Sequence, residues 1–233
     1  MKGSLYIIPV LLGGEDISAL IPEGTLNKIR PLRYFIVENS KSARHFLKLA
    51  AITTSQQDLV ISEIDKHTDN IPYEQFIKPA LEGHNVGLLS EAGAPAVADP
   101  GAGFILAAHR AGIRVIPLTG PSSLLLALMA SGLNGQSFCF HGYLPVNRDE
   151  KNQKIKQLER DAQFKKQTQL FIETPYRNNQ LLKDLVETLS PGIKLCIACN
   201  LTMENEYIKT QTIASWKKEL PDLHKKPAVF LIL

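Results

Sequence analysis

The strongest constraint on the fold comes from a short apolar segment that stops abruptly in a loop of small residues. Val86 to Leu89 has the length of a buried strand, and the glycines, prolines and alanines of residues 90–101 allow no regular element to continue. Residues 103–112 then have helical spacing and end in glycine. In open α/β sheets, ligands bind just beyond the carboxyl ends of the strands. The order of strand, loop and helix therefore predicts an α/β sheet with a ligand-binding loop at residues 90–101.

The first half of the chain alternates between apolar runs and helical patterns. Strands are predicted for residues 5–12, 33–38, 59–61 and 113–118, and helices for residues 40–50, 73–81 and 124–131. Asn39 or Ser40 is the expected N-cap of the helix at 40–50. The helix at 124–131 is almost wholly apolar, so it is predicted to be buried. This alternation is typical of a parallel sheet covered by helices on both faces.

The second half has a different pattern. Strands are predicted for residues 137–143, 169–173, 194–198 and 228–233, with a further candidate at 202–212. No stretch rich in serine and glycine separates the halves. We therefore place the domain boundary near Leu118, between an N-terminal α/β domain at 1–118 and a C-terminal α/β domain at 119–233.

The composition excludes several classes of protein. The chain has 233 residues, of which 44% are apolar, so it can bury a normal core. No apolar leader follows Met1, and no apolar run approaches the roughly 18 residues of a membrane span. These features, together with only three cysteines, predict a soluble, cytoplasmic protein with no membrane partner. The net charge of +3 permits an anionic partner such as RNA without identifying one.

The familiar catalytic and metal motifs are missing. Cys196 and Cys199 have C-x-x-C spacing, but residues three apart in a strand point to opposite faces, so neither a metal nor a redox pair is expected. No other cysteine pair and no histidine pair has metal-ligand spacing, so no metal site is predicted. No Gly-x-Ser-x-Gly nucleophile motif occurs, since Ser122 and Ser123 begin a helix. Ligand binding by backbone loops is the chemistry that remains.

Residues 148–166 form a charged segment with seven basic and four acidic side chains. A solvated helix face is one explanation of this pattern. The other is a segment that contacts RNA phosphates, because contacts independent of base sequence need only lysine and arginine within reach.

Five motifs in a fixed order carry a resemblance to a known family. They are Ser90-Glu-Ala-Gly-Ala-Pro95, Asp99-Pro-Gly101, Val115-Ile-Pro-Leu-Thr-Gly-Pro-Ser-Ser123, Gly142-Tyr-Leu-Pro145 and Phe171-Ile-Glu-Thr-Pro-Tyr-Arg177. Together they resemble the tetrapyrrole-methylase superfamily of S-adenosylmethionine-dependent methyltransferases. The likeness is strongest to the branch that methylates the ribose 2′-hydroxyl of a cytidine in small-subunit ribosomal RNA.

The resemblance implies a fold, a partner and a set of cofactor contacts. The implied fold has two α/β domains, the first with a mostly parallel sheet and the second with a mixed sheet, and the cofactor lies in the cleft between them, usually in a homodimer. The implied substrate is small-subunit ribosomal RNA. The residues that the resemblance assigns to S-adenosylmethionine are Leu11, Gly13, Ala92, Gly93, Ala94, Val97, Ser122, Ser123, Glu173 and Leu201.

The chain also departs from the family pattern near these contacts. The family usually has Thr-Pro-Ile-Gly-Asn where this chain has Val10-Leu-Leu-Gly-Gly14, and Glu-Asp-Thr-Arg where this chain has Glu38-Asn-Ser-Lys41. It has Arg-Glu-Leu-Thr-Lys in place of Cys199-Asn-Leu-Thr-Met203, and aspartate in place of Glu91. Three of these replacements remove a charge or a rigid proline.

Two carboxylates are candidates for the general base. A ribose hydroxyl is a weak nucleophile, so a base within hydrogen-bond reach would assist methyl transfer. Glu91 is the first candidate, because it stands in the cofactor loop, and Asp99 is the second, although a turn aspartate commonly binds local backbone amides instead. Two other functions stay open at this point. One is methylation of a tetrapyrrole or another small metabolite, and the other is binding of cofactor or RNA without catalysis.

Overall fold

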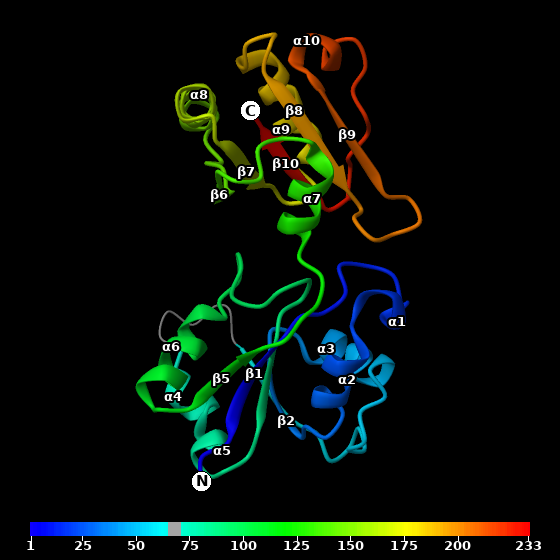
Figure 1. Ribbon diagram of the computed structural model, residues 1–233, viewed down its shortest axis with the longest axis vertical. Coiled ribbons are helices and arrows are strands. Elements are labelled where there is room, and N and C mark those ends of the chain that lie inside the picture. Colours follow the sequence, from blue (N-terminus) through cyan, green and yellow to red (C-terminus); the bar gives the residue numbers. More distant parts are fainter. Residues whose placement is uncertain (65–70) are drawn as a thin grey trace. The chain divides into compact units, whose positions relative to one another are not determined.

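The computed structural model describes residues 1–64 and 71–233. The chain divides into two compact units, Met1–Ser122 and Ser123–Leu233, and each unit contains one five-stranded sheet (Figure 1). The boundary expected from the sequence, near Leu118, lies just before this division.

The sheet of the first unit is parallel throughout its described pairings. Its order is β3-β2-β4-β1-β5. The strands are β1 (Ser4–Ile8), β2 (Tyr34–Val37), β3 (Val60–Glu63), β4 (Val86–Leu89) and β5 (Arg114–Pro117). The central strand β4 is buried along its whole length, which explains its continuous apolar sequence. The predicted parallel sheet is confirmed.

Helices cover both faces of this sheet, with α2 and α3 on one side and α4, α5 and α6 on the other (Figure 1). The helices of the first unit are α1 (Ile17–Leu20), α2 (Glu23–Ile29), α3 (Ser40–Leu49), α4 (Tyr73–Phe76), α5 (Lys78–Leu81) and α6 (Ala102–Arg110). Successive residues of a strand point to opposite faces, so Phe35 packs into one core cluster and Ile36 into the other. Asn39 caps α3, as predicted, because its side chain accepts hydrogen bonds from Lys41 N and Ser42 N.

Three details of the first unit differ from the sequence prediction. The strand expected at 5–12 ends at Ile8, because the next residue, Pro9, has no N–H for the ladder. The helix expected at 73–81 is two short helices that meet at Ile77, whose backbone leaves the helical region at ψ 0°. Helices α1 and α2 were not predicted.

The sheet of the second unit is mixed, as the resemblance implied. Its order is β6-β7-β10-β8-β9, in which only the β6–β7 pair is parallel. The strands are β6 (Phe138–Tyr143), β7 (Thr168–Ile172), β8 (Lys194–Cys199), β9 (Tyr207–Thr212) and β10 (Ala228–Ile232). Because β7 and β8 both run antiparallel to β10, their carboxyl ends lie at the same edge of the sheet.

Four helices belong to the described second unit: α7 (Ser123–Ser131), α8 (Arg148–Lys165), α9 (Asn178–Thr188) and α10 (Ile213–Trp216). The prediction that the helix at 124–131 is buried is correct for only one side of it, where Ala127, Leu128 and Ser131 are buried. One side of α7 packs against β8, β9 and β10, but Leu125 is 54% exposed and Met129 is 79% exposed. A helix packed on one sheet can cover only one side of itself, so its remaining apolar residues face outward.

Candidate functional site

The loop after β4 is joined to the turn after β1. Val10 and Gly93 form an isolated bridge, in which Val10 N donates to Gly93 O at 2.9 Å. Gly93 is buried and has φ +72°, a conformation that favours glycine, and a Cβ added there would lie 3.0 Å from Leu12 Cδ2. Leu11 and Gly13 lie in the same turn and are half-buried. The structure therefore brings together the two loops that the sequence analysis assigned to the cofactor in this unit.

The rest of the loop presents small side chains and strained backbone. Ala92 and Val97 are exposed, and Ala94 is half-buried. Ala96 and Ala98 have φ values of +66° and +65°, which non-glycine residues seldom adopt. Strain of this kind often marks a functional loop, because the surrounding structure must enforce it.

Asp99 organises this loop. Its Oδ1 accepts hydrogen bonds from Ala96 N at 2.8 Å and from Gly101 N at 2.7 Å. A turn aspartate commonly makes such contacts with local backbone amides. This was the alternative to a catalytic role for Asp99. A catalytic role for Asp99 stays a prediction.

Glu91 is held by two other elements of the first unit. Its Oε1 accepts a hydrogen bond from the Ser42 hydroxyl at 2.7 Å, and its backbone N donates to Glu38 Oε1 at 3.3 Å. Glu38 follows β2, and Ser42 lies in the first turn of α3. Both lie close to Glu91 because β2 and β4 are adjacent strands. Ser42 was not predicted as a site residue. Its position just after a capped helix start, beyond the end of a central strand, is the signal that could have found it.

The segment that joins the two units contains Ser122 and Ser123. Ser122 is half-buried and ends the first unit, and Ser123 begins α7. The preceding Thr119 is tied to the first unit, since its carbonyl accepts a hydrogen bond from Thr25 Oγ1 at 2.9 Å.

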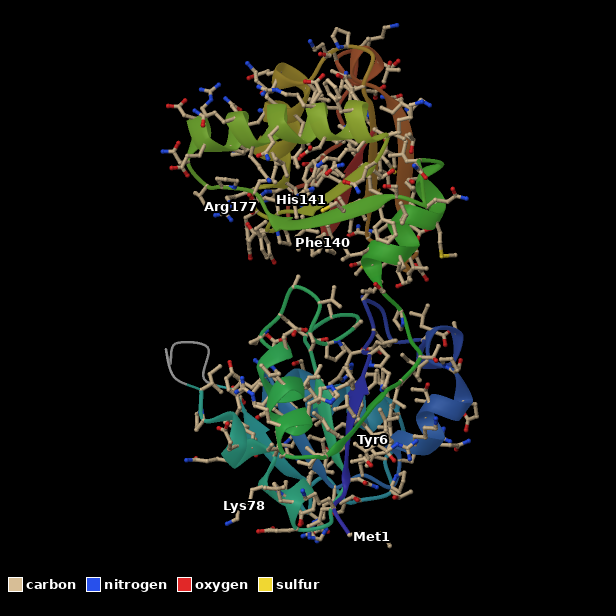
Figure 2. The ribbon with its side chains drawn as sticks, turned by 60° about the vertical axis from the view of Figure 1, so that its left-hand side comes forward. Met1, Tyr6, Lys78, Phe140, His141 and Arg177 are labelled. Carbon is tan, nitrogen blue, oxygen red and sulfur yellow. The ribbon has the colours of Figure 1, made fainter. Side chains whose placement is uncertain are left out.

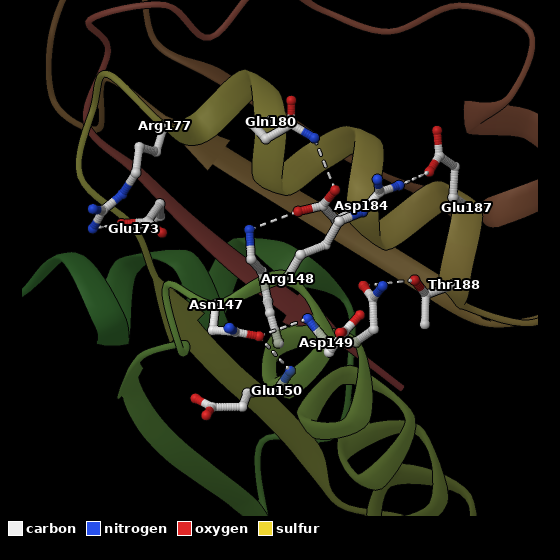
Figure 3. A network of polar contacts seen from close by, with 12 residues as sticks. Asn147, Arg148, Asp149, Glu150, Glu173, Arg177, Gln180, Asp184, Glu187 and Thr188 are labelled. Carbon is white, nitrogen blue, oxygen red and sulfur yellow. Dashed lines mark hydrogen bonds and ion pairs between the residues drawn. The ribbon is translucent and has the colours of Figure 1, made fainter.

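Glu173 follows β7 and is held within its own turn by Arg177 (Figure 3), which is also labelled in Figure 2. Its side chain is 1% exposed, and Oε1 accepts hydrogen bonds from Thr174 N and from the Arg177 guanidinium, both at 2.7 Å. The Arg177 side chain itself is 46% exposed. A charge-assisted pair of this kind fixes the turn beyond the strand.

Leu201 follows β8 at the same edge of the sheet. It is buried between Asn200 and Thr202, whose φ values of +51° and +70° again place non-glycine residues in the left-handed region. Thr202 Oγ1 is buried and has no hydrogen-bond partner in the described part of the chain. Asn200 and Thr202 were not predicted as site residues. A positive φ at a threonine has no signature in the amino-acid sequence.

The cysteines of β8 are free thiols. Burial is the largest influence on both, and it raises the pKa of Cys196 and of Cys199. Within residues 1–64 and 71–233, no cluster of histidine, cysteine, aspartate and glutamate could hold a metal ion. The same ranges contain no helix with the length and apolar character that crossing a bilayer requires.

Helix α8 carries the charged segment, and three of its basic residues are held in ion pairs. The pairs are Arg148 with Glu187 at 3.7 Å, Lys151 with Asp184 at 2.7 Å, and Lys165 with Asp161 at 2.8 Å. The hydrogen bond from Lys165 lowers the pKa of the Asp161 carboxyl. Lys156, Arg160 and Lys166 are exposed.

Solved methyltransferase structures share this fold. The structure titled "Crystal structure of the methyltransferase CobJ" matches over 99% of this chain and 94% of that chain, with a TM-score of 0.64 and 18% identity. A uroporphyrin-III-C-methyltransferase from Thermus thermophilus matches over 99% of this chain and 94% of its own, with a TM-score of 0.57 and 18% identity. At such identities the likeness shows the fold alone.

Residues 5–216 match the family of Tetrapyrrole (Corrin/Porphyrin) Methylases. The protein belongs to this family and is a methyltransferase, which confirms the resemblance drawn from the five motifs. Relatives named "Ribosomal RNA small subunit methyltransferase I" occur in Buchnera aphidicola, with 29% identity over 99% of this chain and 78% of the relative, and in Escherichia coli O157:H7, with 27% identity over the same shares. The relative of that name from Vibrio cholerae is 28% identical over 98% of this chain and 76% of its own.

Proposed function

We propose that this methyltransferase uses S-adenosylmethionine to methylate a ribose 2′-hydroxyl in small-subunit ribosomal RNA. The observation that carries the substrate class is the set of relatives named for that RNA, which align with 98–99% of the chain. The solved enzyme named for a uroporphyrin substrate is 18% identical, so it supports the fold without favouring a tetrapyrrole. We further propose that the protein acts in the cytoplasm as a homodimer, in which a second copy would cover exposed Leu125 and Met129.

The loops of both units fit the proposed cofactor. In the first unit, Gly93 lets its loop pack closely against Leu12 of the neighbouring turn, where a Cβ would lie 3.0 Å from Leu12 Cδ2. In the second unit, Thr202 Oγ1 is a buried polar atom without a partner in the described structure. The residues proposed to hold S-adenosylmethionine are Leu11, Gly13, Ala92, Gly93, Ala94, Val97, Ser122, Ser123, Glu173 and Leu201. Bound there, the cofactor supplies an activated methyl group.

The protein's task in this reaction is chiefly alignment. In-line displacement needs the ribose oxygen, the methyl carbon and the sulfur in a row, and good alignment contributes roughly 7–11 kcal/mol. Glu91 is proposed to accept the proton of the ribose hydroxyl, and the hydrogen bond from Ser42 orients its carboxylate. Exposed Lys156 and Arg160 on α8 are proposed to contact RNA phosphates, since they take part in none of the ion pairs described for this helix.

Cofactor binding predicts a stabilisation that depends on Gly93. S-Adenosylhomocysteine at about 100 times its dissociation constant should add roughly 2.7 kcal/mol to the free energy of unfolding of the wild type. Gly93→Ala should lose most of this gain, because the added methyl group would crowd Leu12 and shift the two joined loops that are proposed to hold the cofactor. Thermal melting with and without ligand measures both effects.

Gly132→Ala is the matched control for this variant. Gly132 also has a positive φ, +66°, but an added Cβ would meet no atom within 4 Å. Both substitutions place alanine at a positive φ, but only Gly93→Ala also crowds a neighbouring side chain, and only Gly93→Ala should lose the response to ligand. A wild-type melting temperature that millimolar ligand leaves unchanged would contradict the proposed cofactor, and equal gains in the two variants would reject the role of Gly93.

A further inference from the structure

Tyr176 is an exposed aromatic residue next to a proposed cofactor contact. It lies in the turn between β7 and α9, and it is 70% exposed. The His224 ring meets it edge-on with 6.3 Å between centroids, and Lys225 Nζ lies 5.9 Å from the centre of the tyrosine ring. Two segments almost fifty residues apart in sequence thus build one small surface, which we call the Tyr176 platform: Tyr176, His224 and Lys225.

The platform is held in place by its backbone. Lys225 N donates to Pro175 O at 3.1 Å, and Asn178 Nδ2 donates to Lys226 O at 2.7 Å, so the two segments are directly bonded. The backbone of Lys225 is left-handed, with φ +58°, a conformation that these contacts enforce. The backbone positions from which the ring and the ammonium group extend are therefore fixed relative to each other.

The neighbouring Asn179 fixes the second segment as well. Its Oδ1 accepts from Leu223 N and its Nδ2 donates to Asp222 Oδ1, both at 2.7 Å. This hydrogen bond is the largest cause that lowers the pKa of Asp222, so its carboxylate stays ionised and engaged within the loop. Two exposed cations, Arg177 and Lys225, lie in the same two segments as the ring.

An exposed ring with adjacent cations matches the chemistry of an unpaired nucleotide. Unstacked bases bind on aromatic side chains, while lysine and arginine take the flanking phosphates, whereas a duplex hides the faces of its bases. The centre of an interface with another protein copy is instead depleted of lysine. Arg177 also binds Glu173, so the platform is linked to a proposed cofactor contact within the same unit.

We propose that the Tyr176 platform stacks an unpaired base of the substrate RNA close to the nucleotide that is methylated. This inference rests on the proposed function. It adds a substrate subsite in which Tyr176 holds the base and Lys225 contacts a neighbouring phosphate.

Binding of a single-stranded fragment of small-subunit ribosomal RNA tests the platform. Tyr176→Ala should raise the dissociation constant roughly 5- to 150-fold, the range found for loss of one base–aromatic stack, whereas Tyr176→Phe should bind like the wild type. Lys225→Asn, which tolerates the left-handed backbone, should reduce the slope of log affinity against log salt by about 1. Lys218→Asn removes another exposed charge of the second unit and should leave the slope unchanged.

Three readouts separate this inference from the proposed function. Each variant should keep the stabilisation by S-adenosylhomocysteine, which shows that it is folded. A wild type that methylates the RNA while Tyr176→Ala shows an unchanged KM would overturn the platform alone. A Tyr176→Ala variant with altered sedimentation would assign the ring to contact between protein copies and also overturn it. A wild type that transfers no methyl group to RNA would instead contradict the proposed function.

Discussion

Replacing Glu91 with glutamine is expected to slow methyl transfer to RNA about 10²- to 10⁴-fold, the usual contribution of a general base. The amide oxygen of glutamine can still accept the Ser42 hydrogen bond, so the loop should keep its shape. Only the ability to take a proton is lost. Single-turnover rates with saturating cofactor and RNA measure the effect.

Two controls define what such a loss means. The dissociation constant for S-adenosylhomocysteine should be unchanged in Glu91→Gln, because the cofactor is assigned to backbone and small side chains of the loop. Glu91→Asp should retain much more activity than Glu91→Gln, since the carboxylate is kept. If Glu91→Gln reacts at the wild-type rate, Glu91 is not the base.

Replacing Lys151 with methionine is expected to cost about 3–5 kcal/mol of folding free energy, the usual result of breaking a buried ion pair. The Lys151 side chain is 10% exposed and that of Asp184 only 2%, and their 2.7 Å contact joins α8 to α9. Without the lysine, Asp184 keeps a hydrogen bond from Gln180 but no buried cation. Urea unfolding measures the loss.

Two further variants calibrate this result. The double variant Lys151→Met with Asp184→Leu removes both charges and should recover most of the stability, because an apolar pair leaves no carboxylate uncompensated. Arg148→Ala breaks the exposed pair with Glu187 on the same two helices, and it should cost less than about 1 kcal/mol. A loss below 1 kcal/mol for Lys151→Met would show that the buried Asp184 carboxylate does not depend on the lysine.

Much of the fold could be predicted, because its strands are apolar runs that end at glycine, proline or polar residues. Strand β4 is the clearest case, since burial on both faces requires every residue from Val86 to Leu89 to be apolar or small. The exposed side of α7 could not be predicted in this way. Composition shows that a helix is apolar, but Leu125 and Met129 face outward because the sheet lies on only one side.

Some residues of the candidate site could likewise be predicted from the sequence, and others could not. Loop residues such as Gly93 follow a strand directly, so their place at the sheet edge could be inferred from order alone. The contact between Ser42 and Glu91, and the platform of Tyr176 and His224, join segments far apart in sequence. Such contacts depend on which strands are neighbours and on how loops are hydrogen-bonded. Local sequence patterns predict neither of these.

Methyl transfer to small-subunit ribosomal RNA tests the central proposal most directly. RNA that lacks the modification should be incubated with the protein and labelled S-adenosylmethionine and then hydrolysed in alkali, because a 2′-O-methyl group protects the adjoining phosphodiester from cleavage. We predict label in a single alkali-resistant dinucleotide with the wild type, and a strongly reduced amount with Glu91→Gln. Label on a base, transfer to a tetrapyrrole alone, or no transfer by a protein that binds the cofactor would contradict the account.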